Sequence, residues 1–286
     1  MGVPESRGRV AAVAAKCTRR RLLAGAAGFV VAATAVPRRV PAQPAANDSL
    51  PPLPELKRLV AANRILANEG VVDAFGHVSV RDPRDYGRFV LSRSRSPALV
   101  ELADLMEFAL DGTPVDARGR TPYGERMIHA AIYAARPDVM SVVHHHAESV
   151  LPFTITGEPL RPVVHTASVI GARVPVWDVR TKFGATDMLV RSIEQGRDLA
   201  ATLADNTCLL IRGHGAVVVG ASIPRAVLTA IYLTVNANVL LAAQQLGLPE
   251  GLSAEEIERS SETQFSALAL DRSWEYYCQR AGVDPG

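Results

Sequence analysis

This chain of 286 residues is poor in cysteine and lacks the common glycine-rich nucleotide-binding motifs. Its three cysteines form no Cys-x-x-Cys pair, and nothing indicates a disulfide between Cys208 and Cys278. Neither a Gly-x-Gly-x-x-Gly sequence nor a Walker-type loop occurs, so no dinucleotide or nucleotide site is indicated. With 48% hydrophobic and 21% charged residues, the composition is that of an ordinary globular protein.

Net positive charge is confined to the N-terminal segment. Of the 31 Lys and Arg residues, eight lie in residues 1–42, together with a single acidic residue. The remainder of the chain is therefore net acidic, although the whole chain has a formal charge of +2. Because nucleic-acid binding requires a basic patch, we expect no nucleic-acid partner.

Residues 1–42 have the pattern of an export signal. Arg20 and Arg21 precede a moderately apolar stretch, Leu22 to Val36, and resemble the twin-arginine signal of proteins exported after folding. The apolar stretch is shorter than the roughly 20 residues that span a membrane. We expect an exported protein with no membrane contact after cleavage, or a cytoplasmic one if the start codon was assigned too early. Residues 43–54 hold four prolines and are expected to form a linker before a single domain over residues 55–286.

Hydrophobic periodicity predicts alternating helices and strands without a regular βαβ repeat. Thr121 and Pro122 are expected as the N-cap and first residue of one helix, and Ser253 with Glu256 as the capping box of a C-terminal helical extension. The expected helices cover residues 56–67, 121–135 and 222–246, and the expected strands cover residues 77–81, 88–92, 139–143, 208–212 and 216–219.

Two histidines end the apolar strand around residues 139–143. Side chains two apart in a strand point to the same side, so His144 and His146 project together and His145 points away. Two imidazoles on one face are half of a divalent-metal site. The alternative is a polar strand end with solvated histidines.

Two further residues complete the candidate metal centre. His214 lies between Gly213 and Gly215 in a tight turn between two strands, where the backbone can approach a ligand closely, and is the candidate third ligand. Glu125 lies early in the helix that precedes the His144 strand, so a helix packed back on that strand would bring it to the metal as acid/base. The alternative for Glu125 is an exposed first-turn glutamate favoured by the helix dipole.

These residues resemble the class II aldolase/adducin family over roughly residues 54 to 247. The resemblance implies an α/β fold with three α/β/α layers, a mostly antiparallel central sheet, and a homotetramer with sites near subunit interfaces. It implies His144, His146 and His214 as metal ligands and Glu125 as the acid/base. The matching segments are residues 76–81, 125–129, 132–133, 136–139, 142–146 and 212–215, with Gly220.

The sequence departs from the sugar-phosphate members of this family at two places. His77 stands where those members have asparagine in the glycine loop, and Tyr123-Gly124 replaces the paired serines that hold phosphate. A phosphorylated sugar is therefore disfavoured. The variant motifs look more like the decarboxylase branch, whose members act on hydroxy-carboxy-muconate semialdehydes or dihydroxyphthalate-like acids.

The expected function is that of a metal-dependent lyase, which breaks a C–C bond through a metal-stabilised enolate and decarboxylates a small hydroxy-carboxylic acid. One divalent ion per subunit is expected, with Zn preferred and Mn, Mg, Fe or Co as alternatives. Arg81 and the segment from Ser92 to Arg95 are candidate anion contacts. The expected substrate contacts are His77, Ser79, Arg81, Ser94, Tyr123 and His165.

Three other functions remain open at this point. A retro-aldolase or epimerase acting on a sugar or hydroxy acid would release an aldehyde or invert a centre instead of releasing CO2. An adducin-like assembly module would use the fold without catalysis, although such modules lack the metal histidines. A metal-dependent oxygenase on the same scaffold would require O2 and iron.

Overall fold

The structure of this protein is a computed structural model that describes residues 50–285. The expected export signal, residues 1–42, and residues 43–49 of the expected linker lie outside the described residues. The first helix begins at Leu53, so the last two residues of the expected linker belong to its first turn. Pro54 is accommodated there because the first N–H groups of a helix have no intrahelical partner.

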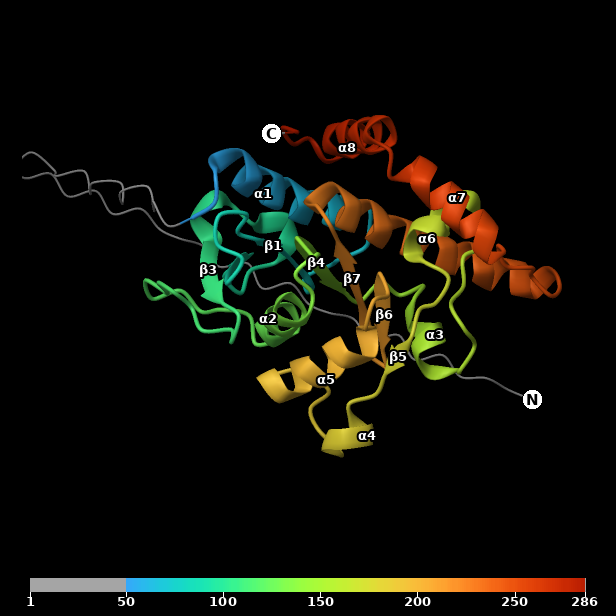
Figure 1. Ribbon diagram of the computed structural model, residues 1–286, viewed down its shortest axis with the longest axis horizontal. Coiled ribbons are helices and arrows are strands. Elements are labelled where there is room, and N and C mark those ends of the chain that lie inside the picture. The colour runs from blue at the N-terminus through green and yellow to red at the C-terminus, as the bar shows by residue number, and fades with distance from the viewer. Residues whose placement is uncertain (1–49, 286) are drawn as a thin grey trace, which may run out of the picture. The chain divides into compact units, whose positions relative to one another are not determined.

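One seven-stranded sheet organises the described residues (Figure 1). The strand order is β3-β2-β1-β4-β7-β6-β5, and every neighbouring pair is antiparallel except β5 with β6. The mostly antiparallel sheet is thereby confirmed. The strands are β1 (His77–Arg81), β2 (Arg88–Ser92), β3 (Leu105–Ala109), β4 (Ser141–His145), β5 (Val176–Trp177), β6 (Cys208–Ile211) and β7 (Gly215–Gly220).

Helices cover both faces of the sheet, as the three-layer α/β/α prediction requires (Figure 1). The helices are α1 (Leu53–Asn68), α2 (Arg126–Ala135), α3 (Leu151–Ile155), α4 (Arg180–Phe183), α5 (Ile193–Leu203), α6 (Ile223–Leu246), α7 (Ala254–Gln264) and α8 (Ala267–Ala281). Alternation along β4 sends Val143 into the core formed with α1, α6 and α8. It sends Val142 into the opposite core, formed with α2 and α5. Residues one apart on a central strand therefore meet different helices.

The longest helix, α6, is the main cover of one sheet face. Ser222 caps it by accepting a hydrogen bond from the Arg225 amide, and it ends before Gly247, as expected. Its length and mean hydropathy of 1.8 would suffice to cross a membrane, but 56% of that apolar window is buried inside the protein. We therefore interpret α6 as a core helix.

The C-terminal extension consists of two helices. Ser253 and Glu256 form the expected capping box at the start of α7. A separate helix, α8, follows and packs Trp274 and Cys278 into the core shared with α1 and α6. The sequence pattern indicated the extension without dividing it into two helices.

One expected helix start is wrong. Helix α2 begins at Arg126 rather than at Thr121, and Glu125 is its N-cap residue. Pro122 forms a β-bridge with Arg93, and the Thr121 carbonyl accepts a hydrogen bond from the Ser94 amide. Pairing with a distant segment of the chain thus replaced the local capping pattern.

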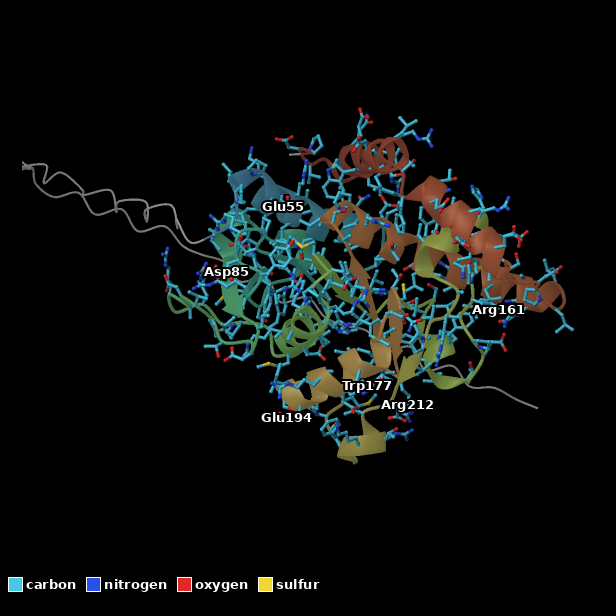
Figure 2. All side chains as sticks on the ribbon, viewed as in Figure 1. Glu55, Asp85, Arg161, Trp177, Glu194 and Arg212 are labelled. Carbon is cyan, nitrogen blue, oxygen red and sulfur yellow. The ribbon has the colours of Figure 1, made fainter. Side chains whose placement is uncertain are left out.

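The segment between β5 and α5 is anchored where it leaves β5, near Trp177 and Arg212 (Figure 2). The Trp177 indole donates to the Asp198 carboxylate of α5 at 2.8 Å. The Arg212 guanidinium lies 3.4 Å from the Asp178 carboxylate. These contacts position a segment that reaches the functional site through its backbone.

Candidate metal centre

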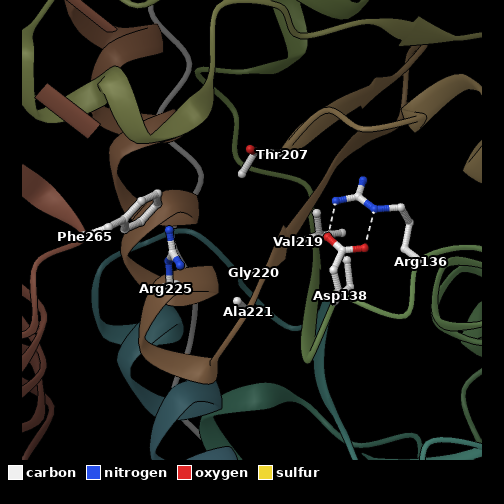
Figure 3. Close-up of a pocket in the computed structure, with 9 residues that line it drawn as sticks. Arg136, Asp138, Thr207, Val219, Gly220, Ala221, Arg225 and Phe265 are labelled. Atoms are coloured by element: carbon white, nitrogen blue, oxygen red, sulfur yellow. Dashed lines mark hydrogen bonds and ion pairs between the residues drawn. The ribbon is translucent and has the colours of Figure 1, made fainter. Parts of the chain in front are cut away.

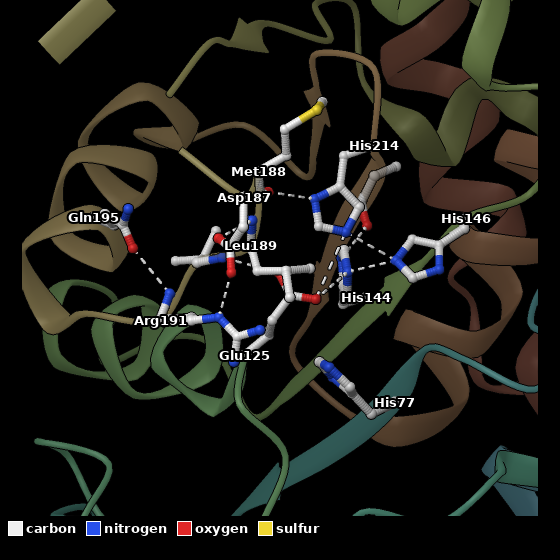
Figure 4. Close-up of polar contacts among 12 residues, drawn as sticks. His77, Glu125, His144, His146, Asp187, Met188, Leu189, Arg191, Gln195 and His214 are labelled. Atoms are coloured by element: carbon white, nitrogen blue, oxygen red, sulfur yellow. Dashed lines mark hydrogen bonds and ion pairs between the residues drawn. The ribbon is translucent and has the colours of Figure 1, made fainter. Parts of the chain in front are cut away.

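Four side chains from three parts of the fold converge at one end of the sheet (Figure 4). His144 lies near the end of β4, and His146 directly follows that strand. His214 lies in the turn between β6 and β7, which the β4–β7 pairing brings beside the histidines. Glu125 reaches them from the N-terminus of α2. The structure therefore brings together the three expected ligands and the expected acid/base.

The distances in this cluster are those of a metal site. His146 Nε2 lies 3.0 Å from the Nε2 atoms of both His144 and His214. One Glu125 carboxylate oxygen lies 3.6 Å from the Nε2 atoms of His144 and His214. All four ligand atoms lie within 4.8 Å of one another. Separations of this size fit ligands at the roughly 2.0–2.2 Å bond lengths of a tetrahedral zinc site.

Backbone carbonyls set which nitrogen of two of the rings is free. His144 Nδ1 lies 3.0 Å from the Ala216 carbonyl, and His214 Nδ1 lies 3.0 Å from the Met188 carbonyl. A carbonyl can only accept, so each Nδ1 carries the proton and each Nε2 presents a lone pair in the neutral ring. Lone pairs and a carboxylate that face one another repel unless a cation lies among them. The donor set therefore fits a divalent metal ion.

Burial keeps the rings of His146 and His214 neutral. Burial, and then the neighbouring His144 and His214, lower the pKa of His146 to about 4. Burial is also the main cause that lowers the pKa of His214. Neutral imidazoles at physiological pH are the form that binds metal.

Glu125 is ionised and held in place. Burial alone would raise the pKa of this carboxyl group. When the rings of His144 and His214 are protonated, the hydrogen bond and charge of His144 and the charge of His214, together with the Val190 amide, outweigh burial and lower the pKa to about 2. The Val190 amide donates to Oε1 at 3.0 Å, which leaves Oε2 facing the histidines. An oriented carboxylate beside the ligand atoms is suited to general base and then acid chemistry.

A cavity of about 380 Å³ opens beside the metal centre. Glu125 and His146 form part of its wall, so both the carboxylate and a metal ligand are accessible from it. Two arginines, Arg95 and Arg191, line it as well, and no Asp lines it. Each guanidinium is also paired with a carboxylate outside the lining, Arg95 with Asp104 and Arg191 with Asp187, so an anionic small molecule would meet guanidinium groups whose charge is partly neutralised.

Three of the six expected substrate contacts lie at this cavity. His77 enters from the start of β1, Ser94 from the segment after β2, and Tyr123 from the segment before α2. The Tyr123 hydroxyl is bonded to the Arg95 carbonyl, which connects two walls of the cavity.

The structure does not bring the other three to the cavity. Arg81 is 1% exposed, and its guanidinium donates to the backbone carbonyls of Val139, Tyr86, Tyr133 and Arg136. Its donors are satisfied by the backbone, so its place is structural.

Ser79 and His165 are also placed away from the cavity. Ser79 is fully buried, and its hydroxyl contacts His129 and Tyr133. His165 begins the short 3-10 helix His165–Ile170, where it is exposed. His145 points away from the metal centre, as expected, and its Nδ1 accepts from the Ala147 amide.

Several groups at the site were not expected from the sequence. Phe75, Leu189 and Arg191 line the cavity without belonging to any motif. The Met188 carbonyl and the Val190 amide orient a ligand and the acid/base through backbone atoms, which carry no signal in residue type. Arg95 was indicated only within a run considered for anion contacts.

A second cavity, of about 200 Å³, lies at the opposite end of β4 and β7 (Figure 3). Arg136 pairs with Asp138 there at 2.7 Å, and the Arg225 guanidinium stacks on Phe265. None of the metal-centre residues reaches it. Glu125 and His146 of the metal centre line the 380 Å³ cavity instead.

The sequence profile of the class II aldolase and adducin N-terminal domain matches residues 57–241. The chain belongs to this family. The match spans every residue of the metal centre, so the cluster belongs to this domain, whereas α7 and α8 follow the matched residues.

Relatives of this family member include decarboxylases and aldolases. The chain is 39% identical to decarboxylase tropJ of Talaromyces stipitatus over 69% of this chain and 79% of that one. It is 30% identical to 3,4-dihydroxyphthalate decarboxylase of Arthrobacter keyseri over 66% of this chain and 78% of that one. The structure of L-fuculose 1-phosphate aldolase of Glaciozyma antarctica is similar to this one, with a TM-score of 0.64 and 26% identity, over 79% of this chain and 88% of that one. The chain is therefore an enzyme of the lyase type in the decarboxylase-like branch.

Proposed function

We propose that this protein is a divalent-metal-dependent decarboxylase of a hydroxy-carboxylic acid. The observation that carries the proposal is the convergence of three imidazole Nε2 atoms and the Glu125 carboxylate beside a cavity lined by two arginines. A divalent cation held by His144, His146 and His214 would supply Lewis-acid stabilisation of the negative charge that develops when a C–C bond breaks. Zn²⁺ is the proposed ion because three neutral imidazoles and an open position suit it. Mn²⁺, Mg²⁺, Fe²⁺ and Co²⁺ are the alternatives.

Glu125 manages the proton in this proposal. Loss of CO2 leaves an electron pair on the substrate carbon, and a proton must be added to that carbon. The ionised carboxylate takes a proton from a substrate hydroxyl and returns one to the carbon, so that acid and base steps balance. The Val190 amide keeps the group oriented during both transfers.

The cavity supports a carboxylate-bearing substrate. Arg95 and Arg191 line it, and a guanidinium can bind a carboxylate through two parallel hydrogen bonds. Tyr123 and Gly124 stand where phosphate-binding serines would be expected, so a carboxylic acid fits better than a sugar phosphate. His77, Ser94 and Tyr123 are the proposed further contacts. The similarity to 3,4-dihydroxyphthalate decarboxylase favours an aromatic acid, and a muconate-semialdehyde type of acid is the alternative.

Metal analysis and a product assay test the proposal together. The purified full chain should contain about one divalent ion per subunit, and it should release CO2 from members of a panel of hydroxy-carboxylic acids. The matched control is His146→Ala, which should lose both the ion and the activity. A protein that binds no ion and is not activated by added divalent ions would contradict the proposal.

A retro-aldolase or epimerase is the second candidate. The similarity to L-fuculose 1-phosphate aldolase favours it, because aldol cleavage needs the same stabilisation of a carbanion. Aldehyde release from hydroxy acids or sugars, without CO2, would establish this function in place of the decarboxylase.

Two further properties are proposed on the sequence alone. Residues 1–42 would direct export, and replacing Arg20 and Arg21 with lysine should retain the protein in the cytoplasm of a bacterium with twin-arginine export. The folded domain would assemble as a homotetramer, which native mass measurement tests directly. Export of the lysine variant, or a monomeric mass, would contradict the respective proposal.

A further inference from the structure

Four polar side chains form a continuous chain from the cavity into the layer between the sheet and α2. His77 Nδ1 lies 2.6 Å from His129 Nε2, and His129 Nδ1 lies 2.6 Å from the Ser79 hydroxyl. The Ser79 hydroxyl lies 2.8 Å from the Tyr133 hydroxyl. Ser79 and His129 are fully buried, and Tyr133 is 1% exposed. Since water does not reach these groups, each proton in the chain must be placed by its neighbours.

Only two arrangements of protons satisfy all three hydrogen bonds with neutral rings. In the first, Tyr133 donates to Ser79, Ser79 donates to His129, and His129 donates to His77 Nδ1. In the second, every bond is reversed, and His77 Nδ1 donates into the chain. The first leaves the His77 proton on Nε2, and the second leaves a lone pair there.

Tyr133 decides between the two arrangements. Besides Ser79, its hydroxyl has only the Val142 backbone amide as a hydrogen-bond partner within residues 50–285, and an N–H group can donate but not accept. In the reversed arrangement the phenol proton would be buried without an acceptor, which disfavours that arrangement by roughly tenfold or more. The phenol therefore donates to Ser79, and the direction of every other bond follows.

The other end of the chain faces the cavity. His77 lines the cavity, with its ring centroid 4.6 Å from that of Tyr123 and 5.1 Å from that of the ligand His144. Among the described residues, His77 Nε2 has no hydrogen-bond partner, whereas Nδ1 is engaged by His129. The ring can therefore offer its free nitrogen to a bound molecule.

We propose that Tyr133, Ser79 and His129 hold His77 in the tautomer with its proton on Nε2, so that His77 presents a fixed neutral hydrogen-bond donor to the substrate beside the metal centre. Tyr133, Ser79 and His129 are positioning residues, and His77 is the group that touches substrate. A donor there pairs with a carboxylate or phenolate oxygen, whereas a lone pair would repel it. The role of the donor rests on the proposed function, but the tautomer itself does not.

Nitrogen NMR of the full chain, labelled with ¹⁵N-histidine and loaded with diamagnetic Zn²⁺, tests the proposal without substrate. The chain has seven histidines, so His77 is assigned by comparison with His77→Gln. We expect His77 in one neutral form with the proton on Nε2. A proton on Nδ1, or a doubly protonated ring, would overturn the proposal.

Tyr133→Phe tests why His77 prefers the Nε2-protonated tautomer, because the substitution removes only the hydroxyl at the end of the series of hydrogen bonds. Without the phenol proton the two arrangements become similar in energy, so the Nδ1-protonated form of His77 should rise to roughly a third of the population or more. Ser141→Ala is the matched control. Ser141 is equally buried on β4, but its hydroxyl donates to the Ser79 carbonyl oxygen, which is not part of the series of hydrogen bonds from Tyr133 to His77. An unchanged tautomer in Tyr133→Phe would overturn the role of Tyr133.

Kinetics with an accepted substrate link the tautomer to function. The value of kcat/KM for Tyr133→Phe should fall in proportion to the remaining fraction of Nε2-protonated His77, and it should not fall for Ser141→Ala. A fall without a tautomer change would indicate a merely structural effect and contradict the proposal. If no decarboxylation is found, the proposed function fails while the NMR result still decides the tautomer.

Discussion

Glu125 differs from the histidines around it because it is the charged member of the cluster and is oriented by a backbone amide rather than by a carbonyl. Glu125→Gln keeps the size of the group and an oxygen for the Val190 amide, but it cannot accept the substrate proton. We expect the bound metal to be retained and turnover to fall by about 10² to 10⁴. Metal content and initial rates measured on the same sample check this, and near-normal turnover would rule out the acid/base role.

Arg191 is the residue for which we predict an effect on substrate affinity. It lines the cavity, is paired with Asp187 at 2.6 Å, and its Nη1 lies close to Gly124. Arg191→Met should raise KM for a carboxylate substrate about tenfold, because a hydrogen bond to a charged group is lost. The turnover number should change far less.

Arg180 is the matched control for that prediction. It is paired with Asp178 at 2.7 Å in the same exposed region but does not line the cavity. Arg180→Met should therefore leave KM unchanged. Equal effects of the two substitutions would show that loss of positive charge, and not contact with the substrate, raises KM.

The metal centre depends on the close approach of β4 and β7, because His146 follows β4 and His214 precedes β7. A Cβ atom at Gly215 would lie 2.1 Å from the His145 carbonyl oxygen and 2.9 Å from the His146 ring. A backbone atom cannot move aside without displacing its strand, so Gly215→Ala must separate the strands that carry His146 and His214.

We therefore predict that Gly215→Ala weakens metal binding at least tenfold and also lowers the thermal midpoint. Metal titration and thermal unfolding measure the two effects. Gly87→Ala is the control, since its Cβ would meet only the flexible end of Asp85 in an exposed turn. Tight metal binding by Gly215→Ala would mean that the strand spacing does not control the site.

The whole domain should gain stability from the ion, because the ligands come from segments far apart in the chain. His144 and Glu125 belong to different layers, and His214 comes from a turn some 70 residues after His144 in sequence. A ligand that binds only the folded state at 100 times its Kd stabilises that state by about 2.7 kcal/mol.

Removal of metal with a chelator should accordingly lower Tm by several degrees, on the order of 5–10 °C for a domain of this size. Return of Zn²⁺ should restore Tm. His146→Ala should show neither change, because a ligand is missing. Calorimetry with and without chelator gives the comparison, and an equal response of His146→Ala would place the stabilising ion elsewhere.

Alternation along the strands was predictable from sequence, but what covers each face was not. His77, Ser79 and Arg81 lie on the same side of β1, as the period of two requires, and that side is the side of His144. Only His77 reaches the cavity, because α2 and the backbone around Val139 cover the other two. Strand period assigns a face, and tertiary packing decides whether that face meets substrate or core.

The residue types and spacing of the sequence alone therefore indicated the candidate set of one glutamate and three histidines, since strand alternation and glycine turns act between near neighbours. The resemblance that these residues carry implied the family and the layered fold. Only the tertiary structure decided which ring nitrogens face the metal centre, how Arg191 reaches the cavity, and how hydrogen bonds connect Tyr133 to His77. Those features depend on backbone atoms and side chains brought together from distant segments, and no local pattern specifies such contacts.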